Sequence, residues 1–476
     1  MLVSESVPQF AQKGQQMIRF FNHWFHWRPL AQALLDFSFV IVGVIIALMW
    51  NRHGLPIDHK QVILFGLILI ASAMLLNSLL SLYQRIHKRT IFSPRALALL
   101  SLYPSFPIAY AIYVFLPLAP ASRELGQLFA MSAIFGILVT RVSVANPSTS
   151  GVAKRRVLVF GTGVKALEVK RALDRSDPSA EIVGFIAGLN EHDSILQGSQ
   201  LNPGGRTLSE TARALNVHEI VVALSERRGG AMPLRELLDC KLCGIRVLDL
   251  SSHFEKSLGQ VRLDSLYAGW LIFSDGFNQG PIRSLVKRFS DIVFSLILLI
   301  VALPLMLITA LLIGLESGFP VLYRQERVGL NGRLFNVIKF RSMHCDAEKD
   351  GKAVWAKVAD DRVTKVGRII RKLRIDELPQ LVCVLMGDMS LIGPRPERPF
   401  FVDQLTREIP FYAVRHSVKP GVTGWAQVCY HYGSTVEDAA EKLQYDLYYV
   451  KNNSLFLDLV ILFETVVVVI TGKGAQ

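Results

Sequence analysis

Four long apolar stretches in the first third of the chain constrain its fold more than any other feature. They run over residues 31–50, 62–83, 96–120 and 125–144, and each is close to the ~20 residues that a helix needs to cross a bilayer. Hydrophobic residues make up 51% of the sequence, which together with these stretches argues against a purely soluble protein. We therefore predict a membrane domain of four transmembrane helices over residues 1–145.

The basic residues in the short loops predict how this domain is oriented. The amino end, the loop after the second stretch and the exit from the fourth together carry eleven Lys or Arg residues, against three in the other two loops. Because short basic loops stay in the cytoplasm, we expect the amino end and everything after residue 145 to be cytoplasmic. The net charge of +13 suits anionic lipid, phosphorylated substrates or nucleic acid, and charge alone does not choose among them.

Strands that alternate with helices predict a small, parallel, Rossmann-like α/β domain over residues 151–275. The expected strands cover 156–160, 182–186, 219–224 and 245–248. Gly161 and Gly163 follow the first strand and open a helix, as in a dinucleotide-binding turn. No acidic residue follows the second strand closely enough to bind a ribose, so cofactor binding and a structural or regulatory role both stay open.

A fifth apolar stretch, Ile292–Leu315, has Pro304 near its centre and basic residues on both flanks. A proline within a helix removes a backbone hydrogen bond and bends it, and basic residues at both ends conflict with a full crossing. We predict a re-entrant helix over residues 287–315 that enters the membrane and returns at Pro304. An ordinary fifth span, which would put the last domain outside, stays open as the alternative.

Two adjacent carboxylates, Asp376 and Glu377, follow a run of cations that ends at Arg374. Neighbouring side chains on a helix diverge by about 100°, so the pair cannot share one proton but can face two ligands. If Asp376 is a helix N-cap, the unpaired amides and the helix dipole favour the anionic form that a nucleophile requires. A solvated cap with surface charges is the alternative.

Three further basic residues are candidates for binding phosphate oxygens. Arg395 lies in the rigid turn Gly393-Pro394-Arg395-Pro396. Lys339 and Arg341 are two positions apart and share one face if the segment is a strand. A structural salt bridge for Arg395 and a solvated basic strand for the other two remain open.

The segment from about residue 284 to the end resembles the bacterial sugar transferase family of monotopic polyprenyl-phosphate phosphoglycosyltransferases. The whole layout is similar to the large members that act as exopolysaccharide or undecaprenyl-phosphate sugar phosphotransferases. One departure is Leu303, where members commonly have a serine before the proline. The matching residues are Lys287-Arg288-Phe289 with Asp291, Pro304, Lys339-Phe340-Arg341-Ser342-Met343, Asp376-Glu377-Leu378-Pro379-Gln380, Gly393-Pro394-Arg395-Pro396, Lys419 to Gln427, and Tyr445-Asp446-Leu447-Tyr448-Tyr449.

The resemblance implies transfer of a hexose 1-phosphate from a UDP-sugar to undecaprenyl phosphate with release of UMP, the initiating step of exopolysaccharide or O-antigen synthesis. It also implies that Asp376 is the nucleophile that forms a covalent intermediate, and that Glu377 binds Mg²⁺. Lys339, Arg341, Arg374, Arg395 and Asp446 are the expected substrate-binding residues.

From the residues and the resemblance together we expect a helical membrane bundle, a cytosolic Rossmann-like α/β domain, and a mainly helical α+β catalytic domain over residues 284–476. The expected location is the bacterial inner membrane, multi-pass, with the catalytic domain facing the cytoplasm. The expected partners are the lipid bilayer and the two substrates, with a homodimer as the candidate assembly and no nucleic acid. The competing functions are a membrane-tethered NAD-dependent dehydratase, which usually needs a Tyr-x-x-x-Lys pair that the chain lacks, and a non-enzymatic scaffold or regulator.

Overall fold

The computed structural model describes residues 154–176, 180–188, 200–202, 204–224, 232–263, 266, 280–344, 362–430, 433 and 435–471, the strands β1 (Met17–Phe20) and β2 (His23–His26), and residues 38 and 41. The predicted membrane domain of residues 1–145 lies almost wholly outside these residues. The chain forms two compact units. The first comprises Met1–Phe20 and Trp24–His253, and the second comprises Phe21–His23 and Phe254–Gln476.

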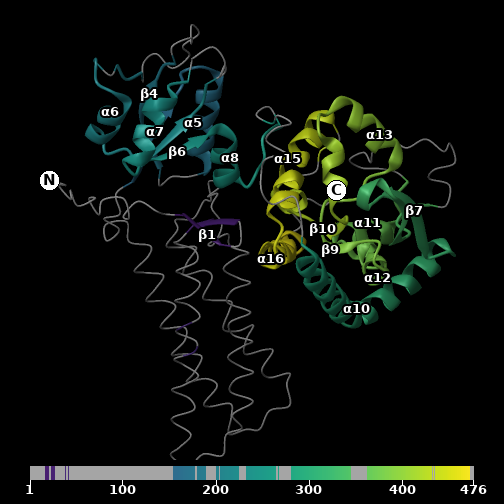
Figure 1. The fold of residues 1–476 in the computed structure, drawn as a ribbon. Coiled ribbons are helices and arrows are strands. Elements are labelled where there is room, and N and C mark those ends of the chain that lie inside the picture. Colours follow the sequence, from purple (N-terminus) through teal and green to yellow (C-terminus); the bar gives the residue numbers. More distant parts are fainter. Residues whose placement is uncertain are drawn as a thin grey trace, which may run out of the picture. The chain divides into compact units, whose positions relative to one another are not determined.

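The first unit contains a four-stranded parallel sheet with the strand order β4-β3-β5-β6 (Figure 1). Its strands are β3 (Arg155–Phe160), β4 (Ala180–Ile186), β5 (Glu219–Val222) and β6 (Arg246–Asp249). The helices α5 (Val164–Ser176), α6 (Leu208–Ala214) and α7 (Leu234–Leu242) alternate with the strands, and α8 (Leu250–Leu258) follows the last strand. The predicted parallel sheet with alternating helices is confirmed.

After the charged residues at which they begin, the central strands β3 and β5 are apolar, as expected where both faces of a parallel sheet are covered. Val157, Leu158 and Val159 of β3 and Ile220 and Val221 of β5 are fully buried. The predicted glycine turn also lies where the sequence placed it, between β3 and α5. Gly161 adopts a φ of 134° there, a backbone conformation that favours glycine.

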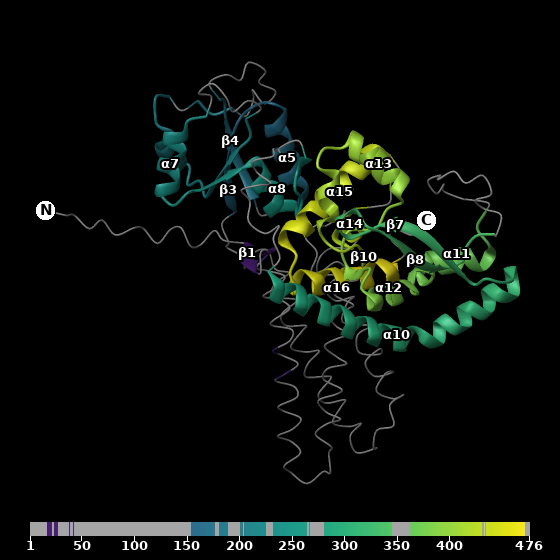
Figure 2. The same ribbon diagram turned by 45° about the vertical axis from the view of Figure 1, so that its right-hand side comes forward.

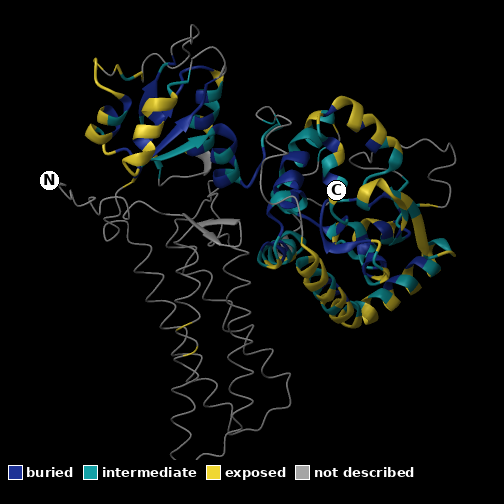
Figure 3. Ribbon diagram, viewed as in Figure 1, coloured by how far each residue is buried: buried dark blue, intermediate teal, exposed yellow. Residues whose placement is uncertain are grey.

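The second unit begins its main helical region with α10 (Pro281–Ser317), the one helix in the described part of the chain that is long and apolar enough to cross a membrane. Most of its large apolar side chains are exposed, including Leu296, Ile300, Leu307 and Leu311 (Figure 3). Pro304 lies inside the helix, and α10 changes direction between its two ends (Figure 2). A bent helix with an exposed apolar surface is what a re-entrant segment requires, and the re-entry itself stays a prediction.

After α10, two small sheets and a set of helices complete the second unit. The antiparallel hairpin β7 (Leu322–Val328) and β8 (Leu334–Phe340) turns at η5 (Leu330–Gly332), and the parallel pair is β9 (Ser390–Ile392) with β10 (Gly421–Thr423). The helices and 3₁₀ turns are α11 (Lys365–Lys372), η6 (Ile375–Glu377), α12 (Gln380–Met386), α13 (Pro399–Glu408), η7 (Tyr412–Ser417), α14 (Trp425–Cys429), α15 (Val436–Asn452) and α16 (Leu455–Thr471).

The core of the second unit forms where α15 and α16 pack against β9. Leu447, Tyr448 and Tyr449 of α15 and Leu457 and Ile461 of α16 are almost fully buried in one apolar cluster. A capping box at Thr435 begins α15, because the Thr435 hydroxyl accepts from the Asp438 amide and the Asp438 carboxylate accepts from the Thr435 amide. This core fixes β9, the strand that leads directly to Arg395.

Candidate active site

The Asp376–Glu377 pair lies in the 3₁₀ turn η6 between α11 and α12. Arg374 precedes the turn in a left-handed conformation, with a φ of 59°, and this sharp reversal turns the chain from α11 into the acidic pair. The conditional prediction that Asp376 is a helix N-cap is wrong: the N-cap of η6 is Arg374, and that of α12 is Pro379. The short turn comes first, and α12 begins only after the proline.

The two carboxylates have different surroundings, as expected for side chains that diverge from one turn. Glu377 is buried, whereas Asp376 is half-buried. Glu377 Oε1 lies 2.8 Å from Arg395 Nη2, 3.3 Å from Lys339 Nζ and 3.7 Å from Arg374 Nη1. Three of the predicted substrate-binding residues therefore meet on one oxygen of the predicted metal ligand.

Arg395 reaches this cluster from a tight crossing of two glycine turns. The Gly393 amide donates to the Thr423 carbonyl at 2.9 Å, and the Gly421 amide donates to the Pro394 carbonyl at 2.9 Å. A Cβ atom on Gly393 would clash with the Lys419 carbonyl oxygen, and one on Gly421 would clash with the Gly393 amide. Only glycine allows this approach, and the crossing holds the backbone of Arg395 in place.

Lys339 reaches the cluster from β8. Burial lowers the pKa of Lys339, and the neighbouring Glu377 carboxylate opposes that shift. The Glu377 carboxylate likewise holds the pKa of Arg395 above its ordinary value. The cluster is thus a group of three cations, Lys339, Arg374 and Arg395, around one buried acid.

The same surroundings separate the pKa values of the two acids. Burial would raise the pKa of Glu377, but Arg395, Lys339 and Arg374 together outweigh burial and hold that pKa well below its usual range. Burial and the negative charge of Glu377 raise the pKa of Asp376 to about 6. Glu377 is therefore anionic at all physiological pH values, and Asp376 is mostly anionic at neutral pH.

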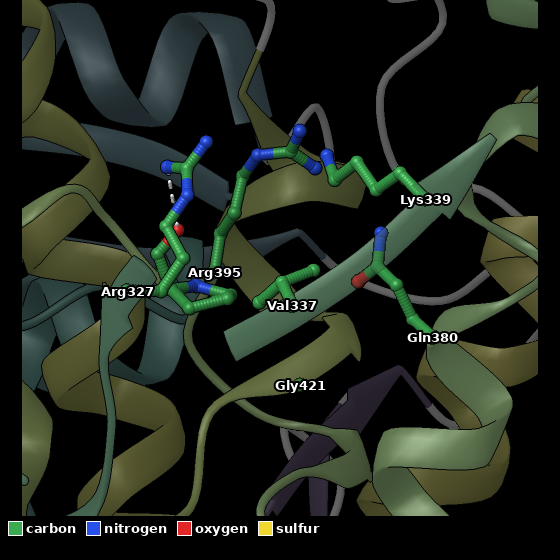
Figure 4. A pocket seen from close by; sticks show the side chains of 7 residues that line it. Arg327, Val337, Lys339, Gln380, Arg395 and Gly421 are labelled. Atoms are coloured by element: carbon green, nitrogen blue, oxygen red, sulfur yellow. Dashed lines mark hydrogen bonds between the residues drawn. The ribbon is translucent and has the colours of Figure 1, made fainter. Parts of the chain in front are cut away.

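A hollow with about 240 Å³ of empty space, part of it open to solvent, lies beside the cluster (Figure 4). Three of the side chains around it, Arg327, Lys339 and Arg395, are cations. In Figure 4 the ends of Arg395 and Lys339 point toward one another across the hollow. Asp376 is not among the lining residues, but its neighbour Glu377 contacts two of them. The lining residues are Arg327, Val337, Lys339, Gln380, Arg395, Pro396 and Gly421.

Two of the predicted substrate-binding residues lie elsewhere. Arg341 follows β8, and its guanidinium donates to the Ser317 carbonyl at 2.8 Å and to the Gly318 carbonyl at 2.5 Å at the end of α10. The expectation that Lys339 and Arg341 face one site is wrong, because β8 ends at Phe340 and Arg341 turns toward α10. Asp446 is buried on α15 and pairs with Arg415 at 2.8 Å.

Arg327 and Arg415 are site residues that the sequence reasoning missed. Arg327 lines the hollow from β7, and its side chain donates to the Pro396 carbonyl at 3.1 Å. Buried Arg415 donates to the Arg395 carbonyl at 2.9 Å and to the Tyr412 hydroxyl at 2.6 Å. The available signal for Arg415 was its position five residues before Pro420, at the start of the turn that contains Gly421. Asp446 therefore acts on the backbone of Arg395 through Arg415.

Glu377 also fits the Mg²⁺ that the family resemblance implies. Both hydrogen bonds that Glu377 accepts end on Oε1, which leaves Oε2 for a metal. No group of three or more His, Cys, Asp or Glu residues that could hold a metal occurs among the described residues. Mg²⁺ commonly takes one or two protein carboxylates and completes its shell with substrate phosphates and waters, so the Glu377 carboxylate suits it.

A buried acid held by several cations, next to a second acid, is an arrangement suited to an enzyme site for phosphorylated substrates. The chain matches the bacterial sugar transferase family over residues 282–472. It belongs to this family, as the sequence predicted.

Three relatives illustrate what the chain is similar to. A UDP-glucose:undecaprenyl-phosphate glucose-1-phosphate transferase of Caulobacter vibrioides is 46% identical over 40% of this chain and 71% of the relative. A UDP-N-acetylgalactosamine-undecaprenyl-phosphate N-acetylgalactosaminephosphotransferase of Aeromonas hydrophila is 48% identical over 51% of this chain and 56% of the relative. A UDP-glucose:undecaprenyl-phosphate glucose-1-phosphate transferase of Escherichia coli K12 is 34% identical over 56% of this chain and 58% of the relative. This chain thus matches little more than half the length of the Aeromonas and Escherichia relatives.

Proposed function

We propose that this protein is an undecaprenyl-phosphate sugar phosphotransferase, which transfers a hexose 1-phosphate from a UDP-sugar to undecaprenyl phosphate and releases UMP. The names of the relatives support both substrates. The observation that carries the proposal is the convergence of Lys339, Arg374 and Arg395 on Glu377 beside the half-buried Asp376. The product, an undecaprenyl-diphosphate sugar, is the starting lipid for an exopolysaccharide or O-antigen.

In the first step, a carboxylate oxygen of Asp376 attacks the sugar-linked phosphorus of the UDP-sugar. The bond between that phosphorus and the oxygen that bridges the two phosphates breaks, and UMP leaves with the bridging oxygen. The sugar 1-phosphate remains on Asp376 as an acyl phosphate ester. Lys339 and Arg395 line the hollow and supply positive charge where the leaving phosphate gains negative charge.

In the second step, an oxygen of undecaprenyl phosphate attacks the same phosphorus and displaces the Asp376 carboxylate. Two steps in sequence allow UMP to leave before the lipid phosphate enters. Glu377 would hold Mg²⁺, which when bound would neutralise diphosphate charge and orient the donor.

The apolar helix α10 supports a membrane location for this chemistry. Its exposed apolar side chains suit the hydrocarbon of a bilayer, where the acceptor's polyprenyl tail lies. We place the active site at the cytoplasmic surface of the inner membrane, with α10 as the re-entrant helix, and the four predicted spans as a further anchor.

The proposal is tested with a radiolabelled UDP-sugar, undecaprenyl phosphate and membranes that contain the protein. The wild type should release UMP and form labelled lipid, and Asp376→Asn should abolish both. Asp388→Asn is the matched control. Asp388 is exposed just after α12, so this variant should leave turnover unchanged. Normal turnover by Asp376→Asn would overturn the proposed nucleophile, and absence of lipid product from the wild type with every UDP-sugar would favour a scaffold or regulator.

The sugar is tested separately, because the relatives include both glucose and N-acetylgalactosamine transferases. Mass spectrometry of the lipid formed from a panel of UDP-sugars should show a hexose product. A product only from N-acetylhexosamine donors would correct the sugar but keep the reaction.

A further inference from the structure

The first turns of α10 carry four charged residues, Arg283, Lys287, Arg288 and Asp291, in a helix that otherwise mostly exposes apolar side chains. Lys287 and Arg288 are half-buried, and Asp291 is 5% exposed. Burial of a carboxylate is costly unless hydrogen bonds and opposite charges compensate it. The contacts of these residues therefore show which segments the amino-terminal part of α10 holds in place.

Asp291 holds β9, the strand that leads into the Arg395 turn. Its Oδ1 atom accepts hydrogen bonds from the Ser390 hydroxyl at 3.0 Å and from the Leu391 amide at 3.2 Å. Ser390 is 1% exposed, so these bonds are shielded from water. Arg395 follows Leu391 by only four residues through the rigid glycine and proline turn. Movement of β9 would therefore move Arg395.

Arg288 holds α12, the helix that follows the acidic pair. Its two terminal nitrogens donate to the carbonyls of Val384 and Leu385 at 2.6 and 2.8 Å. The last carbonyls of a helix have no partner within it, and a cation there also interacts favourably with the helix dipole. Arg288 thereby fixes the carboxyl end of the helix whose amino end follows Glu377.

Lys287 supplies a third connection through α16 and α15. Its Nζ atom lies 2.8 Å from Asp458 Oδ2 and 3.7 Å from Asp291 Oδ1. The Tyr449 hydroxyl is within hydrogen-bonding distance of Asp458 Oδ1, at 2.8 Å, and of the Ile392 carbonyl, at 3.0 Å. α10 thus holds β9 at Ser390 and Leu391 through Asp291. Tyr449, which is linked to Lys287 of α10 through Asp458, holds β9 at Ile392.

We propose that Arg288 and Asp291 of the membrane helix are positioning residues for the transfer reaction, which set the distance between the Asp376–Glu377 turn and Arg395. Neither residue needs to touch a substrate. Each holds one of the two segments that meet at the contact between Glu377 and Arg395, and both lie on α10, so one helix defines the spacing of the two segments. This inference rests on the proposed function, because its kinetic consequence is a slower transfer step.

The kinetic test measures the burst of UMP that the purified protein releases from a UDP-sugar in the absence of lipid acceptor. The amplitude of the burst counts competent sites, and its rate constant reports the geometry within each site. Asp291→Ala and Arg288→Ala should each lower the rate constant by about 10- to 100-fold, as misplacement of reacting groups does, with little change in amplitude. Asp291→Asn keeps an oxygen acceptor and should stay within about fivefold of the wild type.

Ser290→Ala is the matched control, because the Ser290 hydroxyl donates only to the Val286 carbonyl of the same helix. It should behave as the wild type. A fall in amplitude with an unchanged rate constant in Asp291→Ala would assign the residue a merely structural role and overturn the proposal. Unchanged kinetics in both alanine variants would overturn it as well.

Hydrogen exchange separates this inference from the proposed function, because it needs no turnover. Exchange in Asp291→Ala should accelerate in the peptide that contains residues 390–396, and exchange in Arg288→Ala should accelerate in the peptide that contains residues 380–387. Unchanged exchange in both peptides would show that α10 does not hold these segments. The wild-type transfer assay is a separate measurement that tests the proposed function alone. A wild type that makes no lipid product from any donor would contradict the proposed function, whereas unchanged exchange in the variants would contradict the role of α10.

Discussion

Glu377 Oε1 accepts a hydrogen bond from Arg395 Nη2 at 2.8 Å, and this contact joins the turn that carries the acidic pair to the turn that carries the arginine. Lys339 Nζ lies 3.3 Å from the same oxygen. One buried acid thus organises two cations from segments that are far apart in the sequence.

Arg395→Lys should lower kcat/KM by about 100-fold or more, as the loss of a transition-state donor does. Lysine keeps the charge but lacks the planar fork that can hold Glu377 and a phosphate oxygen together. Steady-state UMP release measures the effect. Arg407→Lys, on the exposed surface of α13, is the control and should match the wild type. Equal activity of the two variants would contradict the role assigned to Arg395.

The rate should fall as the pH drops through about 6, because the nucleophile is the anionic form of Asp376 and burial and Glu377 raise the pKa of Asp376 to about 6. Below that value kcat/KM should decrease about tenfold per pH unit. UMP release is measured across pH 5–8, with thermal unfolding at each pH as the control for stability. A rate that stays constant down to pH 5, as expected for an aspartate with the ordinary pKa of about 4, would contradict this environment.

Glu377→Gln should move the acid limb to lower pH while it reduces activity. The substitution removes the negative charge that raises the pKa of Asp376, and the cations that lower that pKa remain. The anionic fraction of Asp376 at a given pH therefore rises. A pH profile of the residual activity, compared with that of Glu377→Asp, measures the shift. A limb that moves to higher pH would show that the carboxylates do not interact as described.

Asp446→Asn and Arg415→Lys should have non-additive effects, because Asp446 acts on Arg395 through Arg415. Residues in one network show coupling energies of about 0.5–3 kcal/mol in double-mutant cycles. The cycle is measured on kcat/KM for the UDP-sugar. Additive losses would instead support direct contact between Asp446 and the substrate.

A cysteine in place of exposed Lys372 on α11 should react with a membrane-impermeant thiol reagent only after the cells are opened. This follows from a re-entrant α10, which returns the chain to the cytoplasmic side. The parent chain, with its own cysteines, provides the background of labelling. Additional labelling of intact cells would mean that α10 crosses the membrane.

The sequence predicted the elements whose signal is local. The β3 strand was expected to begin at Arg156 and begins at Arg155, and the β5 strand was expected to begin at Glu219 and does so. Apolar runs bounded by turns and glycines determine these strands without reference to distant residues. The same holds for α10, whose length and composition are plain in the sequence.

The site was predicted as a set of residues but not as a geometry. Asp376, Glu377, Lys339 and Arg395 were identified, yet the N-cap at Asp376 was wrong because the left-handed Arg374 inserts a 3₁₀ turn before α12. Arg341 and Arg415 show the larger limit. Both are buried arginines whose partners lie on other elements, at Ser317 and at Arg395, and such long-range pairing depends on the packed fold rather than on local pattern.

The covalent intermediate on Asp376 is the central claim, and trapping it is the most direct test. The purified protein is incubated with a UDP-sugar and Mg²⁺ without undecaprenyl phosphate, and the mass of the intact protein is then measured by mass spectrometry. The account predicts a mass increase equal to one sugar 1-phosphate, located on the peptide that contains Asp376, together with one equivalent of UMP and no adduct in Asp376→Asn. Transfer to lipid by a wild type that never carries this adduct, or an adduct on another residue, would contradict it.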